Sequence, residues 1–165
     1  IQFFIEKKLD PNIVNSKGYA PLLIAAKSGN LPVCEFLMDN GTDPRVSTEK
    51  GWSALHFLAS KKVESKEEKQ LQRIIKLLTD NGASLNQKTC NHDTPLHLAC
   101  ASGNDIAVST LLSHKIDCNT VNLFGSTPLM LAIDNNHSNI IQLLLEANAK
   151  IDLINNSIYN SPTKL

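Results

Sequence analysis

The sequence predicts an all-α repeat protein, a solenoid of stacked helix-turn-helix pairs whose repeats are joined by β-hairpin-like loops. The first observation is a seven-residue segment that recurs four times, with its second residue at Pro21, Ala54, Pro95 and Pro128. These positions are 33, 41 and 33 residues apart, so the middle interval is the period of 33 with eight residues inserted. The second observation is another motif in the same phase, which ends at Gly41, Gly82, Lys115 and Asn148. Repeats of this length bury their apolar faces only by stacking on one another.

Each seven-residue segment carries the signals of a helix start. Thr94 and Thr127 precede a proline, and a threonine in this position accepts hydrogen bonds from N–H groups of the first turn. Proline suits the first helical position because its missing N–H group would have no helical partner there. We expect helices of about nine residues that end at Gly29, Gly103 or Asn136, which tolerate a left-handed backbone.

A second helix follows in each copy, marked by apolar residues at helical spacing. In the second copy it is preceded by the insertion, a charged segment from Ser60 to Gln70. Ser65 stands three residues before Glu68, which predicts a capping box in front of the apolar run that begins at Leu71. We therefore expect this helix to be longer by about two turns at its start. The insertion is either a solvated surface or a partner-specific protrusion.

Three turn positions lack the glycine found in the other copies. Lys115 and Asn148 end second helices where two other copies have glycine, and His92 replaces the hairpin glycine. Residues other than glycine rarely adopt a left-handed backbone, so we expect local strain or a different turn at these three positions.

The two motifs together resemble the ankyrin repeat family, whose period is 33 residues and whose signature is Thr-Pro-Leu-His-x-Ala. The segment that begins at Thr94 matches this signature most fully, and the resemblance covers about 150 of the 165 residues. It implies a single domain, 1–165. The complete repeats would be 15–47, 48–88 with the insertion, 89–121 and 122–154. Residues 1–14 would be the second helix and outgoing strand of a preceding repeat, and residues 155–165 a cap or a truncated repeat.

Composition and charge exclude several classes of function. Sixteen basic and sixteen acidic residues give a net charge of zero, which argues against a nucleic-acid partner. With 42% hydrophobic and 19% charged residues the chain is globular, and no apolar run suggests membrane insertion. The four cysteines lack the spacing of a disulfide scaffold or a metal site. This usage favours reduced thiols in a cytoplasmic or nuclear protein.

The sequence contains no catalytic constellation. His56 and His97 recur once per repeat in the helix-start motif, which predicts hydrogen bonds between neighbouring loops instead of a site. The other three histidines share no helix face and have no cysteine at ligand spacing. We therefore expect no enzyme activity, no metal site and no cofactor.

The family resemblance implies that partner-binding residues lie at the hairpin tips and at exposed positions beside the first helices. The candidates are Lys17, Tyr19, Lys27, Lys50, Trp52, Asp93, Leu123 and Phe124. The early lysines favour a partner with an acidic or phosphorylated segment. Trp52, the sole tryptophan, either contacts a partner or packs over the neighbouring hairpin. The exposed pair Leu123 and Phe124 favours contact with a partner.

We therefore expect a non-catalytic protein-protein interaction domain, a scaffold or adaptor that binds a partner protein or linear segment on its concave face. One alternative is the substrate-recruitment arm of a kinase, acyltransferase or ubiquitin ligase, or of a channel, with catalysis outside this segment. Another is a repeat spacer or self-assembly element. The expected location is the cytoplasm or nucleus, or a host cytosol if the protein is a secreted effector.

Overall fold

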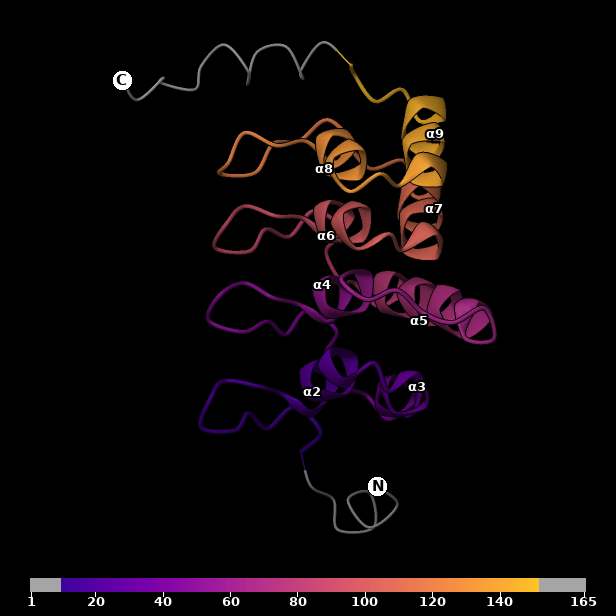
Figure 1. Cartoon of the computed structure of the whole chain (residues 1–165). Coiled ribbons are helices and arrows are strands. Elements are labelled where there is room, and N and C mark those ends of the chain that lie inside the picture. Colours follow the sequence, from indigo (N-terminus) through magenta and orange to yellow (C-terminus); the bar gives the residue numbers. More distant parts are fainter. Residues whose placement is uncertain (1–9, 152–165) are drawn as a thin grey trace.

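The computed structural model describes residues 10–151, and these form a stack of helix pairs (Figure 1). The helices are α2 (Pro21–Ser28), α3 (Leu31–Asp39), α4 (Ala54–Ala59), α5 (Glu68–Asp80), α6 (Pro95–Ser102), α7 (Asp105–Ser113), α8 (Pro128–Asp134) and α9 (Ser138–Glu146). First helices stack in one column and second helices in another, while the hairpin loops all project from the side of the first helices. The predicted all-α solenoid is confirmed. The predictions for residues 1–9 and for the cap at 155–165 lie outside the described residues.

The predicted helix starts at Thr94 and Thr127 are confirmed. The Thr94 hydroxyl accepts a hydrogen bond from the backbone N–H of His97 at 3.5 Å, and Thr127 accepts one from Met130 at 3.2 Å. Proline follows as the first residue of α6 and α8. At the other end, Gly29 and Gly103 adopt the left-handed backbone that was predicted to end α2 and α6.

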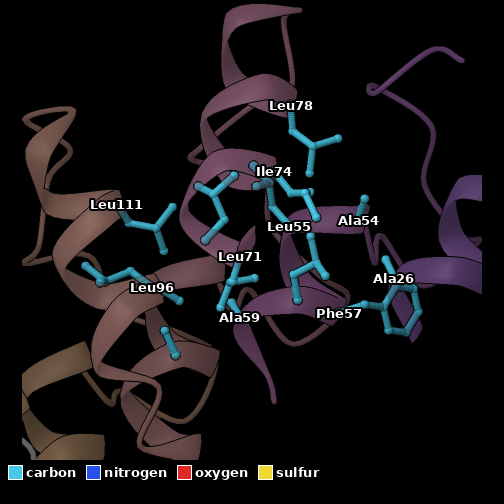
Figure 2. Close-up of a cluster of buried hydrophobic side chains, with 14 of the residues drawn as sticks. Ala26, Ala54, Leu55, Phe57, Ala59, Leu71, Ile74, Leu78, Leu96 and Leu111 are labelled. Carbon is cyan, nitrogen blue, oxygen red and sulfur yellow. The ribbon is translucent and has the colours of Figure 1, made fainter. Parts of the chain in front are cut away.

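A continuous apolar core runs along the stack between the two columns of helices (Figure 2). Leu55 of α4, Ile74 of α5, Leu96 of α6 and Leu111 of α7 are each at most 2% exposed. Their side chains come from two successive repeats and meet in one cluster. Small residues such as Ala59 allow the helices to approach closely. The core is therefore shared between repeats and does not belong to any one helix pair.

Buried histidines tie successive repeats together on the hairpin side. Nδ1 of His56 lies 3.1 Å from the backbone N–H of Ser53, and its Nε2 lies 3.1 Å from the carbonyl of Asp93 in the next repeat. His97 repeats the arrangement, with Nε2 at 3.2 Å from the carbonyl of Ser126. The predicted link between neighbouring loops is confirmed. Burial lowers the pKa of both imidazoles, although the neighbouring carbonyl groups oppose the shift.

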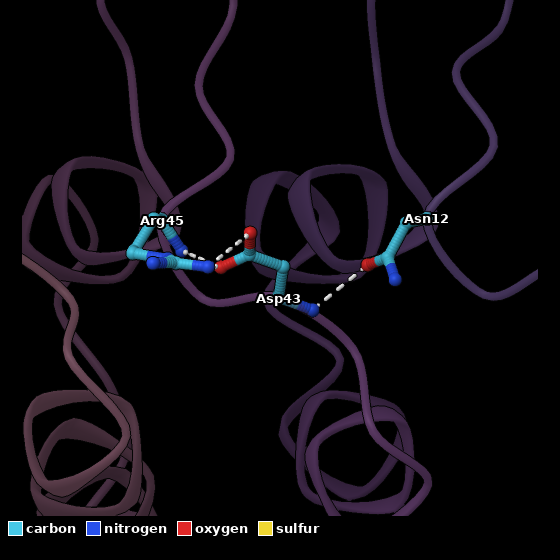
Figure 3. A network of polar contacts seen from close by, with 3 residues as sticks. All are labelled: Asn12, Asp43 and Arg45. Atoms are coloured by element: carbon cyan, nitrogen blue, oxygen red, sulfur yellow. Dashed lines mark hydrogen bonds and ion pairs between the residues drawn. The ribbon is translucent and has the colours of Figure 1, made fainter.

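Asparagine side chains make a second set of links on the side of the second helices (Figure 3). Asn12 Oδ1 accepts a hydrogen bond from the backbone N–H of Asp43 at 2.8 Å, and Asn119 accepts one from Lys150 at 2.7 Å. Both bonds span 31 residues and join one repeat to the next. Beside the first of them, hydrogen bonds from Arg45 lower the pKa of the Asp43 carboxyl group.

The expected left-handed turns occur at all three positions that lack glycine. The φ angles are 60° at His92, 54° at Lys115 and 63° at Asn148, and Asn136 also has φ 58°. The chain therefore keeps the turn geometry of the repeat and accepts a strained backbone there.

The predicted start of the lengthened second helix is wrong. α5 begins at Glu68 and has 13 residues where α3, α7 and α9 have nine, so it gains about one turn and not two. Glu68 is its first residue, which excludes the predicted capping box with Ser65. Tertiary contacts explain the difference. Val63 packs against the core, and the Lys61 carbonyl accepts a 2.6 Å hydrogen bond from Asn104, so the start of the insertion is held as a loop.

Alanine at two equivalent hairpin glycines should have unequal effects. Gly51 and Gly125 have φ of 77° and 75°, but a Cβ on Gly51 would stand 2.6 Å from the Lys88 carbonyl oxygen, whereas one on Gly125 would meet nothing within 4 Å. Both variants should lose about 1 kcal/mol of stability from the left-handed backbone. Gly51→Ala should lose at least about 1 kcal/mol more, because neighbouring backbone must move. Urea denaturation measures both, and equal losses would contradict this close approach.

The buried histidines should make the fold sensitive to mild acid. Because the pKa values of His56 and His97 are lowered in the folded chain, the unfolded chain binds more protons below about pH 6.5. The free energy of unfolding should therefore be complete above that pH and fall as the pH drops below it. Urea denaturation at pH 7.5 and 5.5, with NMR titration of the two imidazoles, checks the sign. An unchanged or greater stability at pH 5.5 would be incompatible with this linkage.

Candidate binding face

The hairpin loops at 15–20, 48–53, 89–94 and 122–127, together with the first helices, form a surface that we call the hairpin face. Side chains at the base of each loop hold it closed. Asn15 Oδ1 accepts hydrogen bonds from the N–H groups of Lys17 at 2.9 Å and Tyr19 at 3.0 Å. Asn122 Oδ1 accepts from Phe124 and Ser126, both at 3.0 Å. The tip residues are thus presented on a backbone that is already ordered.

Backbone hydrogen bonds also join neighbouring hairpins. The N–H of Cys90 donates to the carbonyl of Lys50, and the N–H of Leu123 donates to the carbonyl of Asn91, both at 2.9 Å. These bonds connect the second, third and fourth hairpins in sequence. The relative positions of residues on different tips are therefore set by direct contacts.

An aromatic cluster lies on the early part of the hairpin face. The ring centroid of Phe57 is 5.0 Å from that of Trp52 and 6.2 Å from that of Tyr19. Phe57 is 7% exposed, while Tyr19 and Trp52 are half-buried. Trp52 therefore packs on the repeat and also leaves part of its ring open to solvent. The structure brings together the two predicted aromatic residues through a third that the sequence analysis did not single out.

The three predicted lysines take different positions on this face. Lys17 and Lys50 are exposed at the tips of the first two hairpins. Lys27 lies at the end of α2, where its Nζ stands 4.7 Å from the Tyr19 ring centroid and donates a 3.3 Å hydrogen bond to the Tyr19 hydroxyl. Lys27 is thus coupled to the aromatic cluster.

The predicted residues of the later face divide into two kinds. Leu123 and Phe124 are 60% and 73% exposed at the fourth hairpin tip. Asp93 is half-buried, and its carboxylate accepts a 2.8 Å hydrogen bond from the Asn122 side chain while its carbonyl contacts His56. Asp93 therefore already serves contacts between repeats, whereas the Leu123 and Phe124 side chains remain accessible.

An apolar stripe along the first helices was missed by the sequence analysis. It consists of the residues three positions after the first helical residue, namely Ile24, Phe57, Leu98 and Leu131. Ile24 is 45% exposed, and Leu98 and Leu131 are half-buried. The signal available in the sequence was the apolar character of this position in all four copies. The hairpin face thus combines an apolar floor with charged and aromatic residues, which is the composition of a protein interface.

The described residues provide little basis for other chemistry. Between residues 10 and 151 no three His, Cys, Asp or Glu side chains are grouped so that they could hold a metal ion. The cysteines are free thiols; Cys34, Cys100 and Cys118 are buried, and burial raises the pKa of Cys34 to about 12. No helix in this range is long and apolar enough to cross a membrane.

Stacked helix pairs with hairpins that project beside an apolar stripe define the class of this protein: a helical-repeat interaction module. Comparison with protein families identifies it further. Residues 1–67 and 62–155 match the family of ankyrin repeats. The chain therefore belongs to the ankyrin repeat family, whose domains generally mediate protein interactions.

Several characterised proteins are similar to this chain. An ankyrin repeat protein of fowlpox virus is 32% identical over 85% of the chain and 40% of its own length. The 26S proteasome regulatory subunit p28 of Saccharomyces cerevisiae is 30% identical over 86% of the chain and 60% of its own length. The human transient receptor potential cation channel subfamily A member 1 is 26% identical over 89% of the chain but only 16% of its own length. The chain thus spans less than two thirds of each of these relatives.

Proposed function

We propose that this domain binds a partner polypeptide on its hairpin face without catalysing a reaction. The observation that carries the proposal is the half-buried pair Tyr19 and Trp52 on Phe57, continuous with the apolar stripe. Aromatic side chains held in place before binding lose little conformational freedom when a partner covers them. The fourth hairpin adds Phe124 on a tip that hydrogen bonds keep ordered. Together these groups offer an elongated surface for a linear segment.

The charges on the early face favour a partner with an acidic or phosphorylated segment. Lys17, Lys27 and Lys50 are exposed around the aromatic cluster. A partner of opposite charge would associate faster, and its association rate would fall as salt rises.

A second candidate function is the recruitment arm of a larger enzyme or of a channel. The small share of the relatives that the chain spans, 16% in the human channel, favours this setting. The same hairpin face would then select a substrate or partner for an activity located elsewhere. We also propose a cytoplasmic or nuclear location, or a host cytosol, because the four cysteines are free thiols.

Replacement of Trp52 by alanine should weaken binding by about 2 kcal/mol or more. The probe is a set of dodecapeptides selected from a displayed random library on the wild-type domain, with affinities measured by calorimetry. Because the Trp52 ring also packs on Phe57, the unfolding free energy should fall too, by about 1 to 2 kcal/mol, without loss of the fold. Lys17→Ala and Lys50→Ala should instead act mainly on the association rate.

The matched control for this experiment is Leu145→Ala, which removes an exposed apolar residue on α9 away from the hairpin face. It should leave peptide affinity unchanged. If Trp52→Ala remains folded and binds the selected peptides as tightly as the wild type, the hairpin face is not the binding surface.

A further inference from the structure

The Lys27 ammonium group is fixed on the hairpin face before any partner arrives. It stands 4.7 Å from the Tyr19 ring centroid and donates a 3.3 Å hydrogen bond to the Tyr19 hydroxyl, yet Lys27 remains exposed. An ammonium group has three donors, so the contact with Tyr19 leaves donors for a further acceptor. A lysine that is already positioned loses less side-chain freedom when it binds an anion.

A second cation lies beside this pair. The side chain of Lys61, from the following repeat, runs along Gly29, and its Nζ would be 3.7 Å from a Cβ placed on that glycine. Gly29 is two residues from Lys27, so both ammonium groups lie at the end of α2. The hairpin tips differ, because the Glu49 side chain lies 3.9 Å from the corresponding position on Gly18, between Lys17 and Lys50. The positive charge is therefore less compensated at the end of α2 than at the tips.

The pairing of Tyr19 with Lys27 is unique to one repeat. The equivalent pairs in the following repeats are Trp52 with Ser60, Asp93 with Ala101, and Ser126 with Asp134. The repeat architecture thus does not require this contact. At the last of these positions the charge is reversed, since the exposed Asp134 stands where Lys27 stands three repeats earlier.

We propose that Tyr19, Lys27 and Lys61 form an anion-binding site for an acidic side chain of a polypeptide partner. The inference rests on the proposed function and adds the partner's orientation. Because Asp134 repels an anion at the equivalent place on α8, the acidic end of the partner lies over α2 and the rest runs toward α8. A polypeptide fits better than a membrane or a nucleic acid, because the site adjoins the recessed apolar stripe and the chain has no net positive charge. A carboxylate and a phosphate share the required chemistry.

The first test compares variants of the site against the dodecapeptides selected on the wild-type domain. The selected peptides should be enriched in acidic residues. Lys27→Met should weaken their binding by about tenfold, and Tyr19→Phe, which keeps the ring but removes the hydroxyl acceptor, by about threefold. The matched control is Lys76→Met, an exposed lysine on α5 outside the hairpin face, which should leave affinity unchanged.

A charge-swapped variant separates a local site from a general charge effect. Lys27→Glu lowers the net charge by two, and the added change Asp134→Lys restores it to zero. If the site is local, the double variant should still bind the selected peptides at least about tenfold more weakly than the wild type. Recovery of wild-type affinity would overturn the proposal, because the net charge alone would then govern binding.

Two further comparisons identify the anion and the class of partner. Versions of one selected peptide with glutamate, phosphoserine or glutamine at the critical position distinguish carboxylate from phosphate, and equal binding of all three would overturn the proposal. If Lys27→Met has no effect while Trp52→Ala abolishes binding, the anion site is wrong and the binding face stands. Lys27-dependent sedimentation with phosphatidylserine vesicles, without Lys27-dependent peptide binding, would assign these cations to a membrane surface and would also overturn it.

Discussion

One short helix pair cannot bury its own apolar surface, and the rest of this structure depends on that constraint. The most deeply buried side chains, such as Leu55 and Leu96, lie where one repeat meets the next. Stability therefore resides in the junctions, as expected for a solenoid. The histidine contacts from His56 to Asp93 and from His97 to Ser126 follow the same logic, because each satisfies a buried imidazole by contact with a neighbouring repeat.

Stacking also determines how a regular scaffold carries an irregular surface. Positions that face the junctions must be apolar or small, whereas positions on the hairpin face are free to vary. At one such position the four repeats have Tyr19, Trp52, Asp93 and Ser126. Two of these pack as aromatic rings on Phe57, while Asp93 turns its carboxylate toward Asn122. Equivalent positions therefore serve binding in one repeat and cohesion in another.

The aromatic cluster shows that packing and recognition need not be separate roles. Trp52 contacts Phe57 and His56, which belong to the junction between the second and third repeats, and still leaves part of its ring exposed. A residue held in this way is rigid, and rigidity lowers the entropy lost on binding. The ordered turn that presents Phe124 has the same effect at the other end of the face.

The sequence by itself determined the period, the helix starts at Thr94 and Thr127, the left-handed turns at His92, Lys115 and Asn148, and the class of function. These features depend on nearby residues and on their repetition, so a single chain is sufficient to predict them. Only the tertiary structure decided that α5 begins at Glu68, that Phe57 joins Tyr19 to Trp52, and that Lys27 is held by Tyr19 beside Lys61. Each of these depends on contacts between turns or between repeats, where competition for packing space and hydrogen-bond partners, and not local preference, selects the conformation.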